Sequence, residues 1–85
     1  MGLSAVERRV LDFERAWWTL GEPKRDAIRA RLQMSPSRYY ALLDRLADSP
    51  DALAYDPLVV RRARRRRAAR RARLFGEAPR RSEPR

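Results

Sequence analysis

The residues with the clearest chemical potential are nine arginines within positions 61–73, where only alanine interrupts them. Each guanidinium is a planar fork that can grip a phosphate group with two parallel hydrogen bonds. A row of such groups binds a polyanion strongly and without regard to its sequence. The predicted phosphate-binding residues of this run are Arg61, Arg62, Arg64, Arg65, Arg66, Arg67, Arg70, Arg71 and Arg73.

A second set of polar residues follows the stretch "QMSPS". Residues 25–46 have the layout of a helix-turn-helix, whose second helix must enter a major groove about 12 Å wide. Its outward face is expected to carry candidates for base contacts, and Ser35, where the helix begins, is a further phosphate candidate. Arg29 and Gln33 stand where many such motifs have a small residue and a glycine, so a plain helical bundle is the alternative. The candidates for base contacts are Ser37, Arg38, Ala41 and Arg45.

Composition excludes several kinds of chemistry. The chain has no cysteine and no histidine, which excludes disulfides and the usual zinc and iron–sulfur ligand sets. Nucleophilic catalysis through Ser–His or Cys–His pairs is excluded as well, because no imidazole is present to take the proton. We therefore expect a protein that is not an enzyme and that uses no cofactor, metal or small-molecule ligand.

The charge is unevenly distributed along the 85 residues. Positions 1–60 hold nine Lys/Arg and nine Asp/Glu, whereas positions 61–85 hold twelve Arg and two Glu, which accounts for the whole net charge of +10. This asymmetry predicts a polyanionic partner, with duplex DNA expected and RNA as the alternative. A membrane surface is disfavoured because the basic segment offers mainly alanine as apolar surface. With no apolar run near the roughly 18 residues of a membrane span, we expect a cytoplasmic, nucleoid-associated protein.

The elements that position these residues are predicted to be helices. Ser4 and Glu7 fit a capping box, and Val6, Val10, Phe13, Trp17 and Leu20 recur at helical spacing up to Gly21. On a second stripe of this helix lie Leu11 and Trp18, which we expect to meet the C-terminal helix or another protomer. Asp12 and Glu14 are expected to form surface ion pairs with nearby arginines.

Proline and cap residues divide the remainder of the chain. Helices are predicted from Pro23, from Ser35-Pro36 and from Asp56-Pro57, with a single turn from Pro50 to about Ala54. The inner faces of the first two should carry Ala27, Ile28 and Leu32, and then Tyr39, Leu42, Leu43 and Leu46. The predicted architecture is all-α, with a bundle over 1–55, an arginine-rich helix over 56–76 and a disordered tail over 77–85. Like charges should fray this helix in isolation, so we expect it to fold on binding.

Two resemblances extend this interpretation. The stretches "LSAVERRVL" and "RLQMSPSRYYALLDRL" resemble the promoter-reading C-terminal domain of bacterial sigma factors. More extensively, "LDFERAWW", "MSPSRYYALLDRL" and "DPLVVRRARRRRAARR" resemble a family of small actinobacterial proteins known only as a domain of unknown function. Its members share the double tryptophan, the Ser-x-x-Arg-Tyr-Tyr helix and a basic C-terminal helix. The resemblance covers about residues 3–75 and implies a helix-turn-helix-like, DNA-associated protein without an established activity.

Together these features predict a DNA-binding protein, either a transcription regulator or a nucleoid-associated protein. Two alternatives stay open: an RNA-binding protein, and an adaptor that docks on the transcription machinery through Leu11 and Trp18. A homodimer would suit a helix-turn-helix that reads two half-sites. Trp17 and Tyr39 are expected in the core, whereas Trp18 and Tyr40 are equally compatible with packing and with a contact surface.

Overall fold

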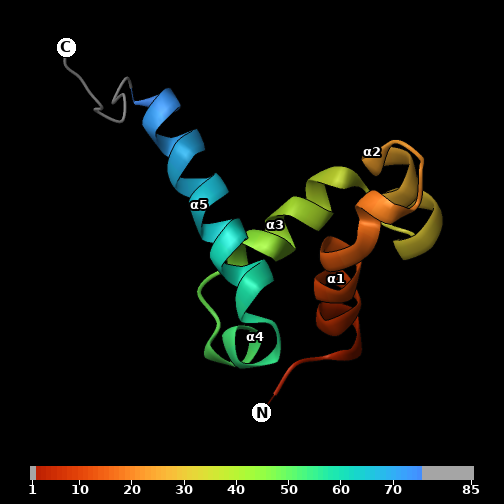
Figure 1. Cartoon of the computed structure of the whole chain (residues 1–85), viewed down its shortest axis with the longest axis horizontal. Coiled ribbons are helices and arrows are strands. Elements are labelled where there is room, and N and C mark those ends of the chain that lie inside the picture. The colour runs from red at the N-terminus through yellow and green to blue at the C-terminus, as the bar shows by residue number, and fades with distance from the viewer. Residues whose placement is uncertain (1, 76–85) are drawn as a thin grey trace.

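The computed structural model describes residues 2–75, and every regular element among them is a helix. The all-α bundle with a long basic C-terminal helix is therefore confirmed (Figure 1). Within these residues no helix is long and apolar enough to cross a membrane. The predicted tail at 77–85 and Gly76 lie outside the described residues. In chain order the elements are α1 Ala5–Ala16, the 3₁₀ turn η1 Trp17–Thr19, α2 Lys24–Ala27, the π-helical segment η2 Ile28–Leu32, α3 Pro36–Leu46, α4 Pro50–Tyr55 and α5 Pro57–Leu74.

The first helix begins with the predicted capping box. The backbone N–H of Ser4 donates to Glu7 Oε1 at 2.8 Å, and the Glu7 N–H donates to Ser4 Oγ at 3.1 Å. The α-helix was expected to reach Leu20, but it ends at Ala16 and tightens into η1 before Gly21 at φ 71°. Its inner face is also rotated from the predicted one: Val6 is exposed, while Val10 and Phe13 are buried together with Leu11 and Glu14.

The next two helices are joined by a tight turn. Pro23 is the N-cap residue of α2, whereas the sequence predicted it as the first residue of this helix. α2 continues without a break into η2. The segment ends at Gln33, which takes the left-handed conformation (φ 55°, ψ 43°) that glycine enters more freely. Ser35 then caps α3, its Oγ accepting from the Arg38 N–H at 3.1 Å. The expected inner residues are buried in both helices, with Leu42 only partly so.

The last two helices each start at a cap followed by proline. Ser49 Oγ accepts from the Ala52 N–H at 3.1 Å, and Asp56 Oδ1 accepts from the Val59 N–H at 3.3 Å. The predicted turn from Pro50 is a short helix that ends at Tyr55, and α5 ends as predicted beside Phe75. With 18 residues at 1.5 Å each, α5 is a rod of about 27 Å.

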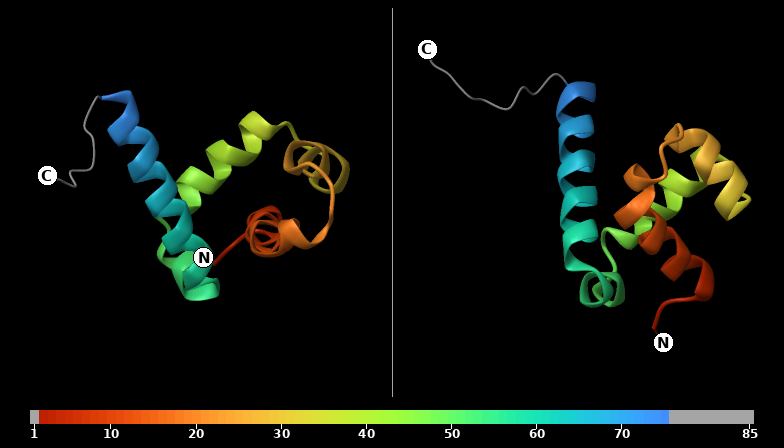
Figure 2. Two further views of the ribbon diagram at one scale, coloured as in Figure 1. Left: turned by 45° about the horizontal axis from the view of Figure 1, so that its top comes forward. Right: turned by 45° about the vertical axis from the view of Figure 1, so that its right-hand side comes forward.

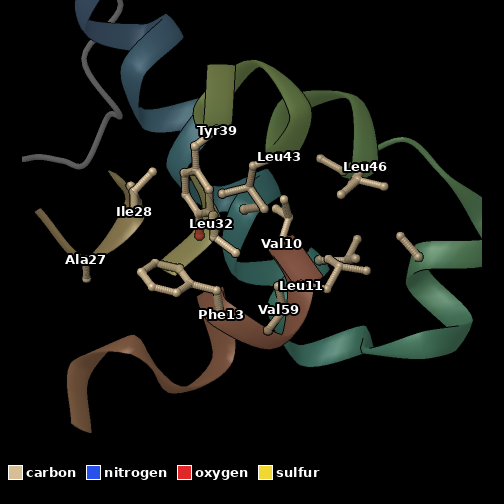
Figure 3. Packing of buried hydrophobic residues seen from close by; sticks show 14 residues of the cluster. Val10, Leu11, Phe13, Ala27, Ile28, Leu32, Tyr39, Leu43, Leu46 and Val59 are labelled. Atoms are coloured by element: carbon tan, nitrogen blue, oxygen red, sulfur yellow. The ribbon is translucent and has the colours of Figure 1, made fainter. Parts of the chain in front are cut away.

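A single hydrophobic core unites all five α-helices (Figure 3). The first turns of α5 belong to it, because Val59, Val60 and Ala63 are buried against the other helices. The boundary drawn between residues 55 and 56 therefore does not separate a bundle from an appended arm. Figure 2 shows α5 as a straight rod at one side of the remaining helices, so its charged half extends directly from the core.

Candidate functional site

The arginines of α5 fall into two sets according to what they contact. Four of them bond to the rest of the protein, and we call them the bonded arginines: Arg64, Arg66, Arg67 and Arg70. Within residues 2–75 the other five make no hydrogen bond or ion pair through their guanidinium groups, and all five are exposed. We call these the outer arginines: Arg61, Arg62, Arg65, Arg71 and Arg73.

The bonded arginines reach acceptors on α1, on α3 and in the turn that follows α3. Arg67 forms a two-pronged pair with Asp48, both N–O distances being 2.9 Å, and Arg70 pairs with Asp44 at 3.0 Å. Arg64 Nε donates to the backbone carbonyl of Ala47 at 2.6 Å. The expectation that like charges would fray this helix until a polyanion arrives is wrong, because carboxylates from the bundle offset the repulsion and α5 is helical to Leu74.

Sequence reasoning missed these partners because it looked for acids only within the arginine-rich segment. The helical spacing of the arginines could have indicated which of them face the bundle. At 100° per residue, Arg66, Arg67 and Arg70 fall on the same side of the helix as the apolar residues Val59 and Ala63. Arginines on that side must face the bundle, where acidic residues can meet them.

Glu14 forms the polar centre of the bundle, which corrects the expectation of a surface pair. This side chain is only 8% exposed and accepts a close hydrogen bond from the Tyr39 hydroxyl. It also binds Lys24 Nζ at 2.8 Å and Arg66 Nη2 at 3.1 Å. Burial above all, and next the Glu14 charge, raise the pKa of the Tyr39 hydroxyl, which therefore stays a neutral donor. Glu14 thus ties α1 to α2, α3 and α5.

Three aromatic rings surround the ammonium group of Lys24. Its Nζ lies 5.1 Å from the ring centre of Trp17, 5.4 Å from that of Tyr39 and 5.0 Å from that of Tyr40. Ring faces attract cations at such distances. Tyr39 is fully buried, as predicted, whereas Trp17 packs against the core and is only partly buried. Tyr40 packs edge-on against Tyr39 and keeps part of its ring exposed.

The four candidates for base contacts share the outward side of α3. Ser37, Arg38, Ala41 and Arg45 are all exposed, and the segment 25–46 that was predicted as a helix-turn-helix comprises α2, η2, the turn at Gln33 and α3. Ser35 lies at the start of α3, where its Oγ already accepts the Arg38 N–H.

The C-terminal end of α3 adjoins arginines of α5. Asp48, just beyond α3, is bonded to Arg67, and this guanidinium holds the pKa of the carboxyl below its usual value. The charges of Arg64 and Arg71 act in the same direction. Figure 1 shows α3 and α5 diverging from the region where they meet.

The two residues predicted to contact another protein differ in their surroundings. Leu11 is fully buried, so its assignment to a contact surface is wrong. The other alternative, that this stripe meets the C-terminal helix, agrees with the structure for Leu11, because the first turns of α5 supply part of the core to which Leu11 belongs. Trp18 is 65% exposed, and its indole N–H donates to the Arg15 carbonyl at 3.1 Å.

A family model for "Protein of unknown function (DUF3263)" matches residues 2–74. The chain belongs to the DUF3263 family. No curated protein and no solved structure matches it.

The DUF3263 match includes α5 up to Leu74. In this DUF3263 protein the arginine-rich helix is therefore part of the family's domain, in agreement with the position of its first turns in the core. The described residues contain no group of three or more Asp or Glu side chains arranged to hold a metal ion.

Proposed function

We propose that this DUF3263 protein binds double-stranded DNA and acts in transcription regulation or in organisation of the nucleoid, without catalysing a reaction. α5 supplies the phosphate-binding surface, and α3 supplies the helix that enters the major groove. One observation carries the proposal: four arginines bond inside the protein and hold α5 in place, while five others extend from that fixed rod into solvent.

The electrostatic part of the proposal follows from the outer arginines. Arginines that have no partner among residues 2–75 are available to replace the counterions around DNA. If each of the five outer arginines contacts one phosphate, the slope of log K against log salt is about −4 to −5. This binding does not discriminate between sequences, so any sequence preference must come from α3.

In the proposal, residues 25–46 act as a helix-turn-helix with α3 as the recognition helix. A major groove admits a helix that presents small or hydrogen-bonding side chains. Ala41 leaves room for close approach to base edges, and Arg38 and Arg45 lie three and four residues from it on the same exposed side. The Arg38→Ala variant should lose preference for a selected site while keeping most of its affinity for unrelated duplex.

Fluorescence anisotropy with labelled duplex across a salt series tests the electrostatic part. The variant R61Q/R65Q removes two outer arginines, and R8Q/R9Q on α1 is a control with the same change of charge. We expect the first variant to reduce the magnitude of the salt slope by about 2 and the control to change it little. Equal changes in both variants would show that net charge alone drives binding. Tighter binding to a folded RNA than to any duplex would assign the site to RNA.

An adaptor role in the transcription machinery is the second candidate, favoured by the exposed indole of Trp18. In that case Trp18→Ala should lose binding to purified RNA polymerase and keep its affinity for duplex DNA. If α3 reads DNA, Arg38→Ala should keep any binding to the polymerase and lose its preference for a selected duplex site. The pair of variants therefore separates the two roles.

A further inference from the structure

Two carboxylates beside α3 are bound by arginines of α5 near the surface. Asp48 holds Arg67 through both oxygens, and Asp44 holds Arg70 through one. The side chains of Asp48 and Asp44 are 68% and 44% exposed, so both pairs border solvent. Asp44 lies in the last turn of α3 and Asp48 in the turn that follows it, and Arg67 bonds to both, donating to the Asp44 carbonyl at 3.3 Å and to the Asp48 carboxylate at 2.9 Å.

This arrangement resembles the way a nucleic-acid strand presents its charges. Successive phosphates of one strand are also anions at a short and regular spacing. A guanidinium binds carboxylate and phosphate in the same two-pronged geometry. Arg67 therefore already holds an anion in the two-pronged geometry in which it would hold a phosphate, and Arg70 holds a second anion beside it through one bond.

We infer that Arg67 and Arg70 form a site for two successive phosphates of one nucleic-acid strand, and that Asp44 and Asp48 occupy this site in the free protein. The inference rests on the proposed DNA binding and extends it. When duplex approaches, its phosphates replace the two carboxylates, which turn into solvent. The carboxylates thus act as internal competitors of DNA.

The other two bonded arginines do not share this property. Arg66 binds Glu14, which is buried and also holds Tyr39 and Lys24, so withdrawal of Arg66 would leave a buried carboxylate with less compensation. Arg64 donates to the backbone carbonyl of Ala47, an acceptor that cannot swing away. The carboxylates Asp44 and Asp48, in contrast, both border solvent, where ion pairs contribute little stability. Arg67 is only 25% exposed and also donates to the Asp44 carbonyl at 3.3 Å, so it keeps this bond to α3 when Asp48 turns away.

Neighbouring charges favour phosphate in the same place. The charges of Arg64 and Arg71 lower the pKa of Asp48 together with Arg67. A phosphate at this position would meet the same concentration of positive charge. With Arg67 and Arg70 added to the outer arginines, the expected salt slope for duplex becomes about −6 instead of about −4 to −5.

The test measures duplex affinity of the D44N/D48N variant against wild type. Removal of a negative charge anywhere on the protein can strengthen DNA binding, so the matched control is D26N/D51N, which changes two exposed acids outside this site. We expect D44N/D48N to bind roughly 3- to 10-fold more tightly than the control at moderate salt. The same pair of substitutions in an R67Q/R70Q background should give no gain over the control.

The possible results distinguish failure of this inference from failure of the proposed function. Equal affinities of D44N/D48N and D26N/D51N, with wild type binding duplex normally, overturn the inference and leave the proposed function intact. A wild type that does not bind duplex at all refutes the proposed function itself. The single variant D44N, whose pair is exposed on both sides, gives the same comparison should the double variant unfold, with the D26N variant as its control.

Discussion

Among substitutions that remove a charge, replacement of Glu14 should lower the free energy of unfolding most. The substitution Glu14→Gln keeps the size of the side chain and removes its charge. Lys24 then loses its carboxylate while its own side chain is only 14% exposed and enclosed by aromatic rings. Arg66, at 44% exposed, can turn to solvent. The main loss therefore comes from a partly buried ammonium group without a counterion.

The size of the effect follows from these exposures. Removal of one partner from a fully buried ion pair costs about 3–5 kcal/mol, whereas exposed pairs contribute about 0–1 kcal/mol. With one enclosed and one half-exposed partner, we expect Glu14→Gln to lower the free energy of unfolding by about 2–4 kcal/mol. In a domain of this size that corresponds to a fall in Tm on the order of 10–25 °C.

Urea denaturation followed by circular dichroism measures the free energy of unfolding. Two variants calibrate it: Tyr39→Phe removes only the hydrogen bond to Glu14 and should cost about 1–2 kcal/mol, and Asp51→Asn should stay within about 0.5 kcal/mol of wild type. A loss below about 1 kcal/mol for Glu14→Gln would refute the reasoning, because it would mean that Lys24 needs no counterion.

Two further predictions concern the turn and the pH dependence of stability. Gln33→Gly should leave the free energy of unfolding unchanged or raise it by up to about 1 kcal/mol, since Gln33 is left-handed, whereas the β-branched Gln33→Val should lower it by about 1–2 kcal/mol; thermal unfolding of both variants checks this. For Asp48 the folded pKa lies below the unfolded value of about 3.9, so its pair with Arg67 stabilises the protein above that pH. This stabilisation should disappear as the pH falls through the folded pKa, and the stability difference between wild type and Asp48→Asn should therefore vanish in acid. A difference that persists unchanged at the lowest pH would contradict the assignment.

Local chemistry made much of this fold predictable from the sequence. Caps such as Ser4 and Ser35 act on backbone groups three residues away, so their positions can be read without knowledge of the rest of the molecule. The left-handed Gln33 was foreseeable for the same reason, because the turn between two helices demands a particular backbone conformation.

Long-range packing was less predictable. The rotation of α1, which buries Leu11 and exposes Val6, depends on contacts with helices that begin far along the chain. The partners of the bonded arginines were missed for a related reason, since they are brought together only by the crossing of α5 with α1 and α3. Of the candidate site, the sequence identified the outward residues of α3 as exposed. Helical spacing could also have marked Arg66, Arg67 and Arg70 as facing the bundle, but not the acids that they meet.

The unbroken course of α5 leaves no hinge between the core and the outer arginines. Val59 and Ala63 are fixed among the other helices, and the same helix continues to Leu74. The guanidinium groups can turn on their side chains, but the axis that carries them keeps one angle to α3. A surface that meets both helices must therefore accept the whole protein as one rigid body in one orientation.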